Sequence, residues 1–268
     1  MAVGSPETTW RVRPRRGELW LVELRHLLPV PLVAVALTGA AGAVAALAPD
    51  IVALGVIREL AVMLCWSGTA IWAAGVLVRH VTLVDDPLVQ LGTRPWWRVA
   101  VGKALMIAAL LTVQHVVTTI AELQTLHAAF GENLAGAVAH AAIAKVASLA
   151  AYLAVVLLVA TLATLVPGRM RAVATVAIGV TIVVVGHALL LWRVGAPDTE
   201  VFVLGVGSDT WTVHLYANVL PLVLTGPSEG VVPDVAWLSL GLNAIVALTA
   251  SATWLALARG RRWDRLPR

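Results

Sequence analysis

Histidines are the side chains best suited to chemistry inside the long apolar stretches of this 268-residue chain. His115, His140 and His187 lie in or near such stretches, where an ionisable side chain is a functional candidate by default. None has another His, Asp or Glu three or four residues away, and the chain has no HExxH or CxxC pattern, so no metal site is predicted. We expect neutral histidines hydrogen-bonded to neighbouring helices. A polar path lined by His187 and Thr181 is the second interpretation.

The carboxylate pair Asp85–Asp86 is the other candidate for catalysis. Enzymes that act on lipid phosphates need further carboxylates or a basic set at fixed spacing, and no second acidic cluster accompanies this pair on its side of the membrane. A phosphate-binding loop is also missing, because Gly102-Lys103 is followed by alanine and Trp97 stands where the first glycine belongs. We predict no catalytic residues, and any ATP is hydrolysed in another chain.

The composition indicates an integral membrane protein. Hydrophobic residues make up 60% of the chain and charged residues only 13%, about half the charged share of soluble domains. The single cysteine, Cys65, lies in an apolar stretch and is expected to be a small buried side chain. No intrachain disulfide is therefore possible.

Six stretches are long enough to cross a hydrocarbon core, which takes about 20 apolar residues. They lie near 29–48, 59–78, 102–121, 143–165, 172–192 and 236–257. We divide the chain into a segment 1–28, one transmembrane domain 29–257 and a basic tail 258–268. Within the first segment, Trp20, Leu24, Leu27 and Leu28 have the spacing of a helix at the membrane surface, although Glu23 interrupts the apolar stripe.

The distribution of basic residues predicts the orientation. Sixteen Lys and Arg residues fall on the side of both termini, whereas only Arg58 and Arg193 fall on the other, with Lys145 in or at the edge of the fourth span. Basic residues are retained in cytoplasmic loops, so both termini are predicted to be cytoplasmic, in a plasma membrane of bacterial type. The net charge of +4 is then a topology signal and does not indicate nucleic-acid binding.

Two connections carry further structure. In the cytoplasmic one, Asp86 and Pro87 open a short helix that Gly92 and Pro95 end; an ordinary loop containing a helix is the alternative. In the outer one, 194–235, an apolar run of roughly 14 residues is too short for a span and predicts a re-entrant broken helix with breaks at Pro221 and Gly226. An interfacial helix anchored by Trp211 and Tyr216 is its alternative.

This order of features resembles the membrane subunits of ABC-2 type exporters, including an amphipathic helix before the first span. The family more often has glutamate where this chain has Asp85 and Asp86. The resemblance implies an all-α fold of six transmembrane helices with a cytoplasmic coupling helix that docks on an ATP-binding subunit. The implied docking residues are Asp85, Asp86, Pro87, Leu88, Leu91 and Arg94, and the implied pathway and outer-gate residues are Ser67, Thr69, Thr181, His187, Trp211, His214, Tyr216, Asn218 and Pro221.

The same resemblance implies the partners. ATP and Mg would be bound by the separate subunit, and this chain would hold no cofactor of its own. A second permease copy or a paralogue would complete the pathway, and membrane lipid would surround it. The competing hypothesis is a non-transporting membrane anchor, such as a b-type cytochrome subunit that uses His115, His140 or His187.

The basic asymmetry predicts which side each connection faces. Cysteines introduced by Gln90→Cys and Asp264→Cys should react with an impermeant reagent only from the cytosolic side, and Ser228→Cys only from outside. Labelling of position 90 from outside would overturn the whole topology.

Overall fold

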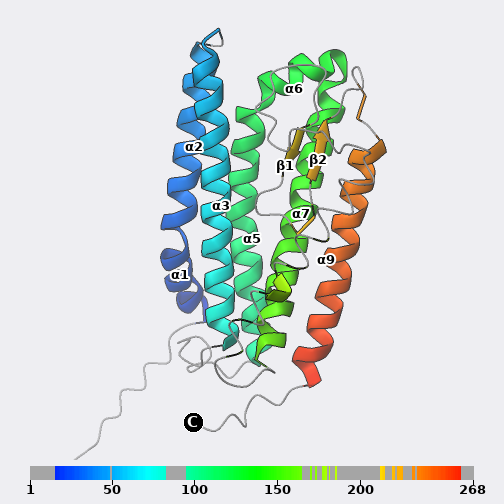
Figure 1. Ribbon diagram of the computed structural model, residues 1–268. Coiled ribbons are helices and arrows are strands. Elements are labelled where there is room, and N and C mark those ends of the chain that lie inside the picture. The colour runs from blue at the N-terminus through cyan, green and yellow to red at the C-terminus, as the bar shows by residue number, and fades with distance from the viewer. Residues whose placement is uncertain are drawn as a thin grey trace, which may run out of the picture.

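Five long helices stand side by side in the computed structural model, with a short helix at each end (Figure 1). The described residues are 16–48, 50–82, 95–164, 170, 173, 177–179, 181, 185, 212–214, 219–220, 222–225, 231–232 and 234–260. The helices are α1 (Arg16–Leu27), α2 (Pro29–Leu47), α3 (Val52–Thr82), α5 (Trp96–Ala121), α6 (Leu123–Phe130), α7 (Leu134–Ala163) and α9 (Asp234–Gly260), with a 3-10 turn η1 (Gly131–Asn133). Two strands, β1 (Thr212–His214) and β2 (Leu222–Thr225), complete the described elements.

Among the described residues, α2, α3, α5, α7 and α9 are the helices long and apolar enough to cross a membrane. These five helices indicate a multi-pass membrane protein. Many large apolar side chains on them are exposed, for example Ile71 at 73% and Leu248 at 71%. Lipid would cover such side chains, because exposing so large an apolar surface to water is unfavourable.

Proline and glycine set several helix boundaries. Pro95 has φ −56° and ψ 136° and directly precedes α5, in keeping with the inability of proline to continue a preceding helix. Between α6 and α7, Gly131 has φ +48°, a conformation that costs glycine little and other residues much more. The polar turn expected between the third and fourth spans thus contains a helix of its own, α6.

Two of the predicted spans are longer than expected. The span predicted at 59–78 is the 31-residue helix α3, which begins at Val52, and the span predicted at 143–165 is α7, which begins at Leu134. Both predicted spans began too late, because Arg58 was expected in an outer loop and Lys145 in or at the edge of the fourth span. Instead, Arg58 and Lys145 lie inside the helices and are buried, so they do not end them.

The relative direction of α7 and α9 follows from contacts near their two ends. His140 contacts Trp237 near the beginnings of α7 and α9, and Thr161 contacts Trp254 near their ends, so these two helices run parallel. The chain between Ala163 and Asp234 must therefore return along the length of the bundle. The predicted fifth span, 172–192, falls in this return; its described residues 173, 177–179, 181 and 185 are helical, and the remainder lies outside the described residues.

We call the two ends of the bundle the α1 end and the α6 end (Figure 1). The α1 end holds α1, the beginning of α5 and the ends of α3, α7 and α9. The largest group of buried apolar side chains packs between these last four helices and includes Leu77, Ile107, Leu111, Leu153 and Trp254. This core makes the bundle one packed unit over the residues described.

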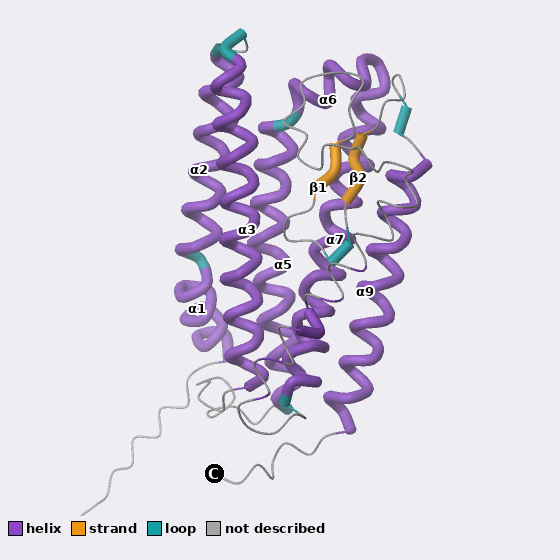
Figure 2. The backbone as a smooth tube through the Cα atoms, in the orientation of Figure 1, coloured by secondary structure: helices purple, strands orange, loops and turns teal. Residues whose placement is uncertain are grey.

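The stretch predicted to form a re-entrant broken helix contains strands. β1 and β2 pair antiparallel, with Val213 opposite Val223 and His214 opposite Leu222, and they lie near the α6 end (Figure 2). Leu222 packs on Ala141 and Ala144 of α7. The helical prediction is therefore wrong for residues 212–214 and 222–225, because a short apolar run is compatible with either strand or helix. Trp211, Tyr216, Asn218 and Pro221 lie outside the described residues.

Helices α2 and α5 approach each other most closely at two glycines of α2. A Cβ atom on Gly42 would lie 2.6 Å from Ala121 Cβ and 3.2 Å from its Cα, whereas one on Gly39 would lie 3.6 Å from Val117 Cγ1. Because the Ala121 Cβ is fixed to its backbone, no rotamer change can relieve the contact at Gly42. Gly42 therefore allows the two helices to approach closely at this point.

The two glycines give a matched pair of variants. Gly42→Ala should lower stability by about 1–3 kcal/mol through overpacking, while Gly39→Ala should be neutral or stabilise by up to about 1 kcal/mol through helix propensity. Thermal unfolding midpoints of the two purified variants in detergent would measure this difference. Equal effects would contradict the close approach at Gly42.

Candidate functional site

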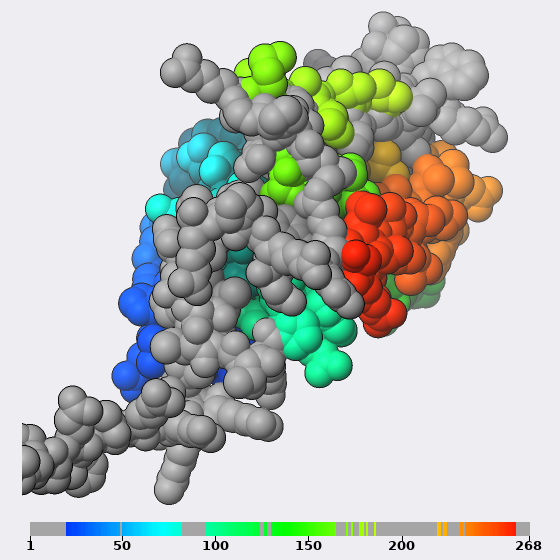
Figure 3. Space-filling model, turned by 90° about the horizontal axis from the view of Figure 1, so that it is seen from below, coloured from blue at the N-terminus to red at the C-terminus, as the bar shows by residue number. Residues whose placement is uncertain are grey.

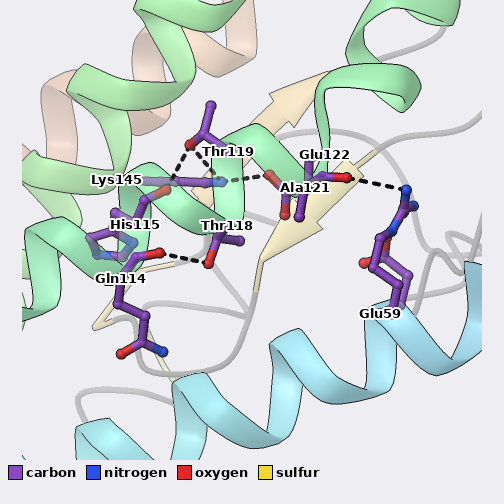
Figure 4. Close-up of polar contacts among 9 residues, drawn as sticks. Glu59, Gln114, His115, Thr118, Thr119, Ala121, Glu122 and Lys145 are labelled. Carbon is purple, nitrogen blue, oxygen red and sulfur yellow. Dashed lines mark hydrogen bonds and ion pairs between the residues drawn. The ribbon is translucent and has the colours of Figure 1, made fainter. Parts of the chain in front are cut away.

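A cluster of buried charged side chains lies at the α6 end, where α3, α5 and α7 meet (Figure 4). We call Arg58, Glu59, Glu122 and Lys145 the ionic cluster. Lys145 Nζ donates to Glu122 Oε2 at 2.5 Å and to Thr119 Oγ1 at 3.2 Å, and the Lys145 side chain is fully buried. A lysine in such a place is tolerated only when it is paired and hydrogen-bonded.

Arg58 forms the second half of the ionic cluster. Its Nη2 and Nε donate to Glu59 Oε1 at 2.6 Å and 3.1 Å, and its Nη1 donates to the Ala121 carbonyl oxygen at 3.4 Å. Ala121 is the last residue of α5, so the guanidinium meets a helix C-terminus, where a positive charge is favourable. One arginine thus links the beginning of α3 to the end of α5.

The order of helices explains why these residues meet. α5 ends at Ala121, Glu122 follows it, and α6 and η1 turn the chain back so that α7 packs antiparallel to α5. Lys145 then lies opposite Glu122. Because two cations and two carboxylates meet, the ionic cluster has no net charge, which reduces the cost of removing it from water.

Polar and aromatic side chains continue from the ionic cluster into the bundle. The ring of His115 lies 3.8 Å from that of Trp66, and Thr118 and Thr119 donate back to the carbonyl oxygens of Gln114 and His115, both at 2.9 Å. In Figure 4 the Gln114 amide extends away from these threonines towards α3. Helices α3 and α5 therefore share a layer of polar and aromatic side chains just inside the ionic cluster.

The histidines have aromatic neighbours. His140 packs edge-on against Trp237 of α9, with ring centroids 4.6 Å apart, as His115 packs on Trp66. The sequence predicts hydrogen bonds from these histidines to neighbouring helices. The structure adds a contact between each histidine ring and a tryptophan ring. Within the described parts of the chain, no group of three His, Cys, Asp or Glu side chains could hold a metal ion. His187 lies outside them.

Several residues of the predicted pathway are described. Thr69 is buried and donates to the Cys65 and Trp66 carbonyl oxygens of its own helix at 2.8 and 3.1 Å, and Ser67 is half-buried on the same helix. Thr181 is exposed and donates to the Ala177 carbonyl oxygen at 2.7 Å. His214 belongs to β1. Among the described residues, the hydrogen bonds of Thr69 and Thr181 stay within their own segments, so they do not join these residues into one site.

The docking residues expected between α3 and α5 cannot be placed in the same way. Asp85, Asp86, Pro87, Leu88, Leu91 and Arg94 all lie outside the described residues. Their predicted role is carried forward as a proposal.

The sequence reading missed the ionic cluster. The sequence analysis expects Arg58 in an outer loop, Glu122 in a polar turn and Lys145 in or at the edge of the fourth span. The sequence did contain a signal for these ion pairs. Two carboxylates and two cations flank apolar stretches in neighbouring helices, and unpaired charges at such positions are rare. Which carboxylate pairs with which cation depends on how the helices pack.

A second ionic contact joins α1 to α5 at the α1 end. Lys103 Nζ lies 2.7 Å from Glu23 Oε1, and both side chains are largely buried. The Trp20 ring packs directly on Gly102. Glu23 was expected to spoil the apolar stripe of α1. In fact it lies between helices and pairs with a lysine, so the stripe need not be continuous there.

Neutralising one member of a buried ion pair tests the ionic cluster. Lys145→Met or Glu122→Gln alone should destabilise the protein by about 3–5 kcal/mol, because each leaves an uncompensated buried charge. The double variant should recover much of that loss. Unfolding midpoints in detergent measure both effects, with Glu132→Gln, exposed at the same end, as the control. If the loss of stability in the double variant equals the sum of the two single losses, Lys145 and Glu122 do not interact energetically.

No model of a known protein family, no curated protein and no solved structure matches this chain. The chain's own features are two ionic contacts on α5, a polar and aromatic layer between α3 and α5, and the connection between these two helices.

Proposed function

We propose that this chain is the membrane-spanning subunit of an exporter that is powered by ATP hydrolysis in a separate subunit. The proposal takes from the sequence the order of spans and the short helix expected at Asp86–Leu91, which resemble ABC-2 type permeases. It takes from the structure the multi-pass bundle and the way α5 is fastened to its neighbours.

The observation that carries the proposal is that α5 is fastened at both ends. Glu23–Lys103 ties its beginning to α1, and Glu122–Lys145 ties its end to α7. Lys103 and Glu122 are about 29 Å apart along the helix axis, close to the roughly 30 Å of a hydrocarbon core. A displacement applied to the connection just before Trp96 would therefore be carried by one stiff helix from one membrane surface to the other.

The packing of the other helices suggests what would move. α2 packs against α3 and α5, whereas α7 packs most extensively against α9 and also contacts β2. We infer two groups, α2–α3–α5 and α7–α9–β2, which contact each other through the apolar core at the α1 end and through the ionic cluster at the α6 end. A push from the ATP-binding subunit on residues 86–91 would tilt the first group against the second and open the pathway on the outer side.

The remaining parts of the proposal follow from the exporter assignment. The partners would be an ATP-binding subunit and a second permease copy or a paralogue, in a bacterial-type plasma membrane with both termini cytoplasmic. The competing cytochrome hypothesis needs two histidines that face one haem. His115 and His140 each pack on a tryptophan instead, so the exporter is the better supported of the two.

Charged substitutions in the connection test the coupling role. Leu88→Glu combined with Leu91→Glu should leave membrane insertion intact, since neither residue lies in a predicted span. The double variant should weaken binding of the ATP-binding subunit about tenfold or more, as expected when anchor residues of an interface are replaced. Co-purification of the partner and stimulation of its ATPase activity are the readouts.

The control for this experiment is Val231→Glu, which adds a charge at an exposed position outside the helices. Unchanged ATPase stimulation in the Leu88/Leu91 variant would refute the coupling role. An absorbance scan of the same preparation near the Soret region decides the haem question, because a b-type cytochrome subunit absorbs there and an exporter subunit does not.

A further inference from the structure

Two arginines that are far apart in the sequence meet over one tryptophan at the α1 end. The guanidinium carbon of Arg98 lies 5.2 Å from the centre of the Trp97 ring, and that of Arg259 lies 5.4 Å from it. Figure 3 views this end and shows the beginning of α5, in green, beside the end of α9, in red. The distance between the two guanidinium carbons therefore cannot exceed the sum of these two distances.

Neighbouring contacts hold this arrangement in place. Trp96 packs edge-on against Trp254 of α9 with ring centroids 6.1 Å apart, and Trp254 Nε1 donates to Thr161 Oγ1 of α7 at 2.9 Å. Both contacts are within one or two turns of the arginines. The ends of α5, α7 and α9 thus position the arginine pair through buried aromatic side chains.

The arginine pair carries charge that no described carboxylate balances. Among the described residues, the ion pairs are those of Arg58, Lys103 and Lys145, and Arg98 and Arg259 are exposed. Arg98 lies in the first turn of α5, whose N-terminus favours an anion, whereas Arg259 lies in the last turn of α9. Like charges held close together in this way are stabilised when an anion lies between or beside them.

The depth of the arginine pair identifies the anion. Arg98 lies about 7 Å beyond Lys103 along α5, and Lys103 and Glu122 already span about one hydrocarbon thickness. Tryptophans such as Trp96 and Trp97 are typical of the boundary between hydrocarbon and headgroups. The guanidinium groups are therefore level with lipid headgroups, whose phosphates fit the hydrogen-bonding geometry of arginine.

We propose that Arg98, Arg259 and Trp97 form a binding site for the headgroup of an acidic phospholipid in the leaflet at the α1 end. Arg98 and Arg259 contact the phosphate, and Trp97 holds both guanidinium groups in position by cation–π contact. Basic clusters between membrane helices are known to hold such headgroups. The site requires only that the bundle is in a bilayer, so it stands or falls independently of the exporter proposal.

The test uses the full chain in a non-ionic detergent, titrated with phosphatidylglycerol or phosphatidylcholine and followed by native mass spectrometry. The wild-type chain should bind phosphatidylglycerol more tightly than phosphatidylcholine. Arg98→Gln and Arg259→Gln should each weaken phosphatidylglycerol binding about fivefold, which corresponds to about 1 kcal/mol per basic residue at an acidic surface. Binding of phosphatidylcholine should not change.

The matched control is Arg79→Gln, which removes an exposed charge from the end of α3 at the same end of the bundle. It should leave the preference for phosphatidylglycerol intact. The variant Arg98→Lys with Arg259→Lys should retain only part of the binding, because lysine keeps the charge but not the planar guanidinium group. Far-UV circular dichroism confirms that each variant is folded.

Three results would overturn the proposal. One is an equal loss in Arg79→Gln, which would mean that net charge and not this site attracts the lipid. Another is unchanged phosphatidylglycerol binding in the double glutamine variant. The third is displacement of the lipid by inorganic phosphate at similar concentration, which would assign the pair to a free anion.

Discussion

A charged side chain buried in an apolar bundle must find its counter-charge in the same place, because no water is present to compensate for it. The ionic cluster of Arg58, Glu59, Glu122 and Lys145 meets this constraint with charges from the beginning of α3, the end of α5 and the middle of α7. Each of these helices carries a charged residue whose burial would destabilise the fold without the opposite charges on the other helices. The relative positions of α3, α5 and α7 at the α6 end are thereby fixed more narrowly than apolar packing alone would fix them.

Helix α5 is the element through which the two ends communicate. Its beginning is held by α1 through Trp20 on Gly102 and Glu23 on Lys103, and its end by the ionic cluster. Along its length it lies close to α2, because Gly42 lets the two backbones approach. Contacts at both ends and with α2 thus hold α5 in place within the bundle.

The strand pair follows from the need to satisfy backbone hydrogen bonds where chain runs beside membrane helices. β1 and β2 pair with each other, and the Val223 N–H also donates to Ser239 Oγ of α9 at 3.2 Å. Ser239 is almost fully buried. A polar side chain of a helix thus completes the hydrogen bonding of β2, and the apolar side chains of β2 fill the space between α7 and α9.

The sequence by itself determined the membrane class and the approximate positions of five apolar helices, because hydrocarbon thickness acts locally. It also predicted a helix before the first span, where α1 lies. It did not determine that Lys145 pairs with Glu122, that Glu23 faces Lys103, or that Arg98 and Arg259 share Trp97, since each contact joins residues from separate helices. Residues 222–225 were decided by packing as well: this part of an apolar run that is too short for a span is a strand, where it packs on α7 and α9 and Ser239 accepts a backbone hydrogen bond.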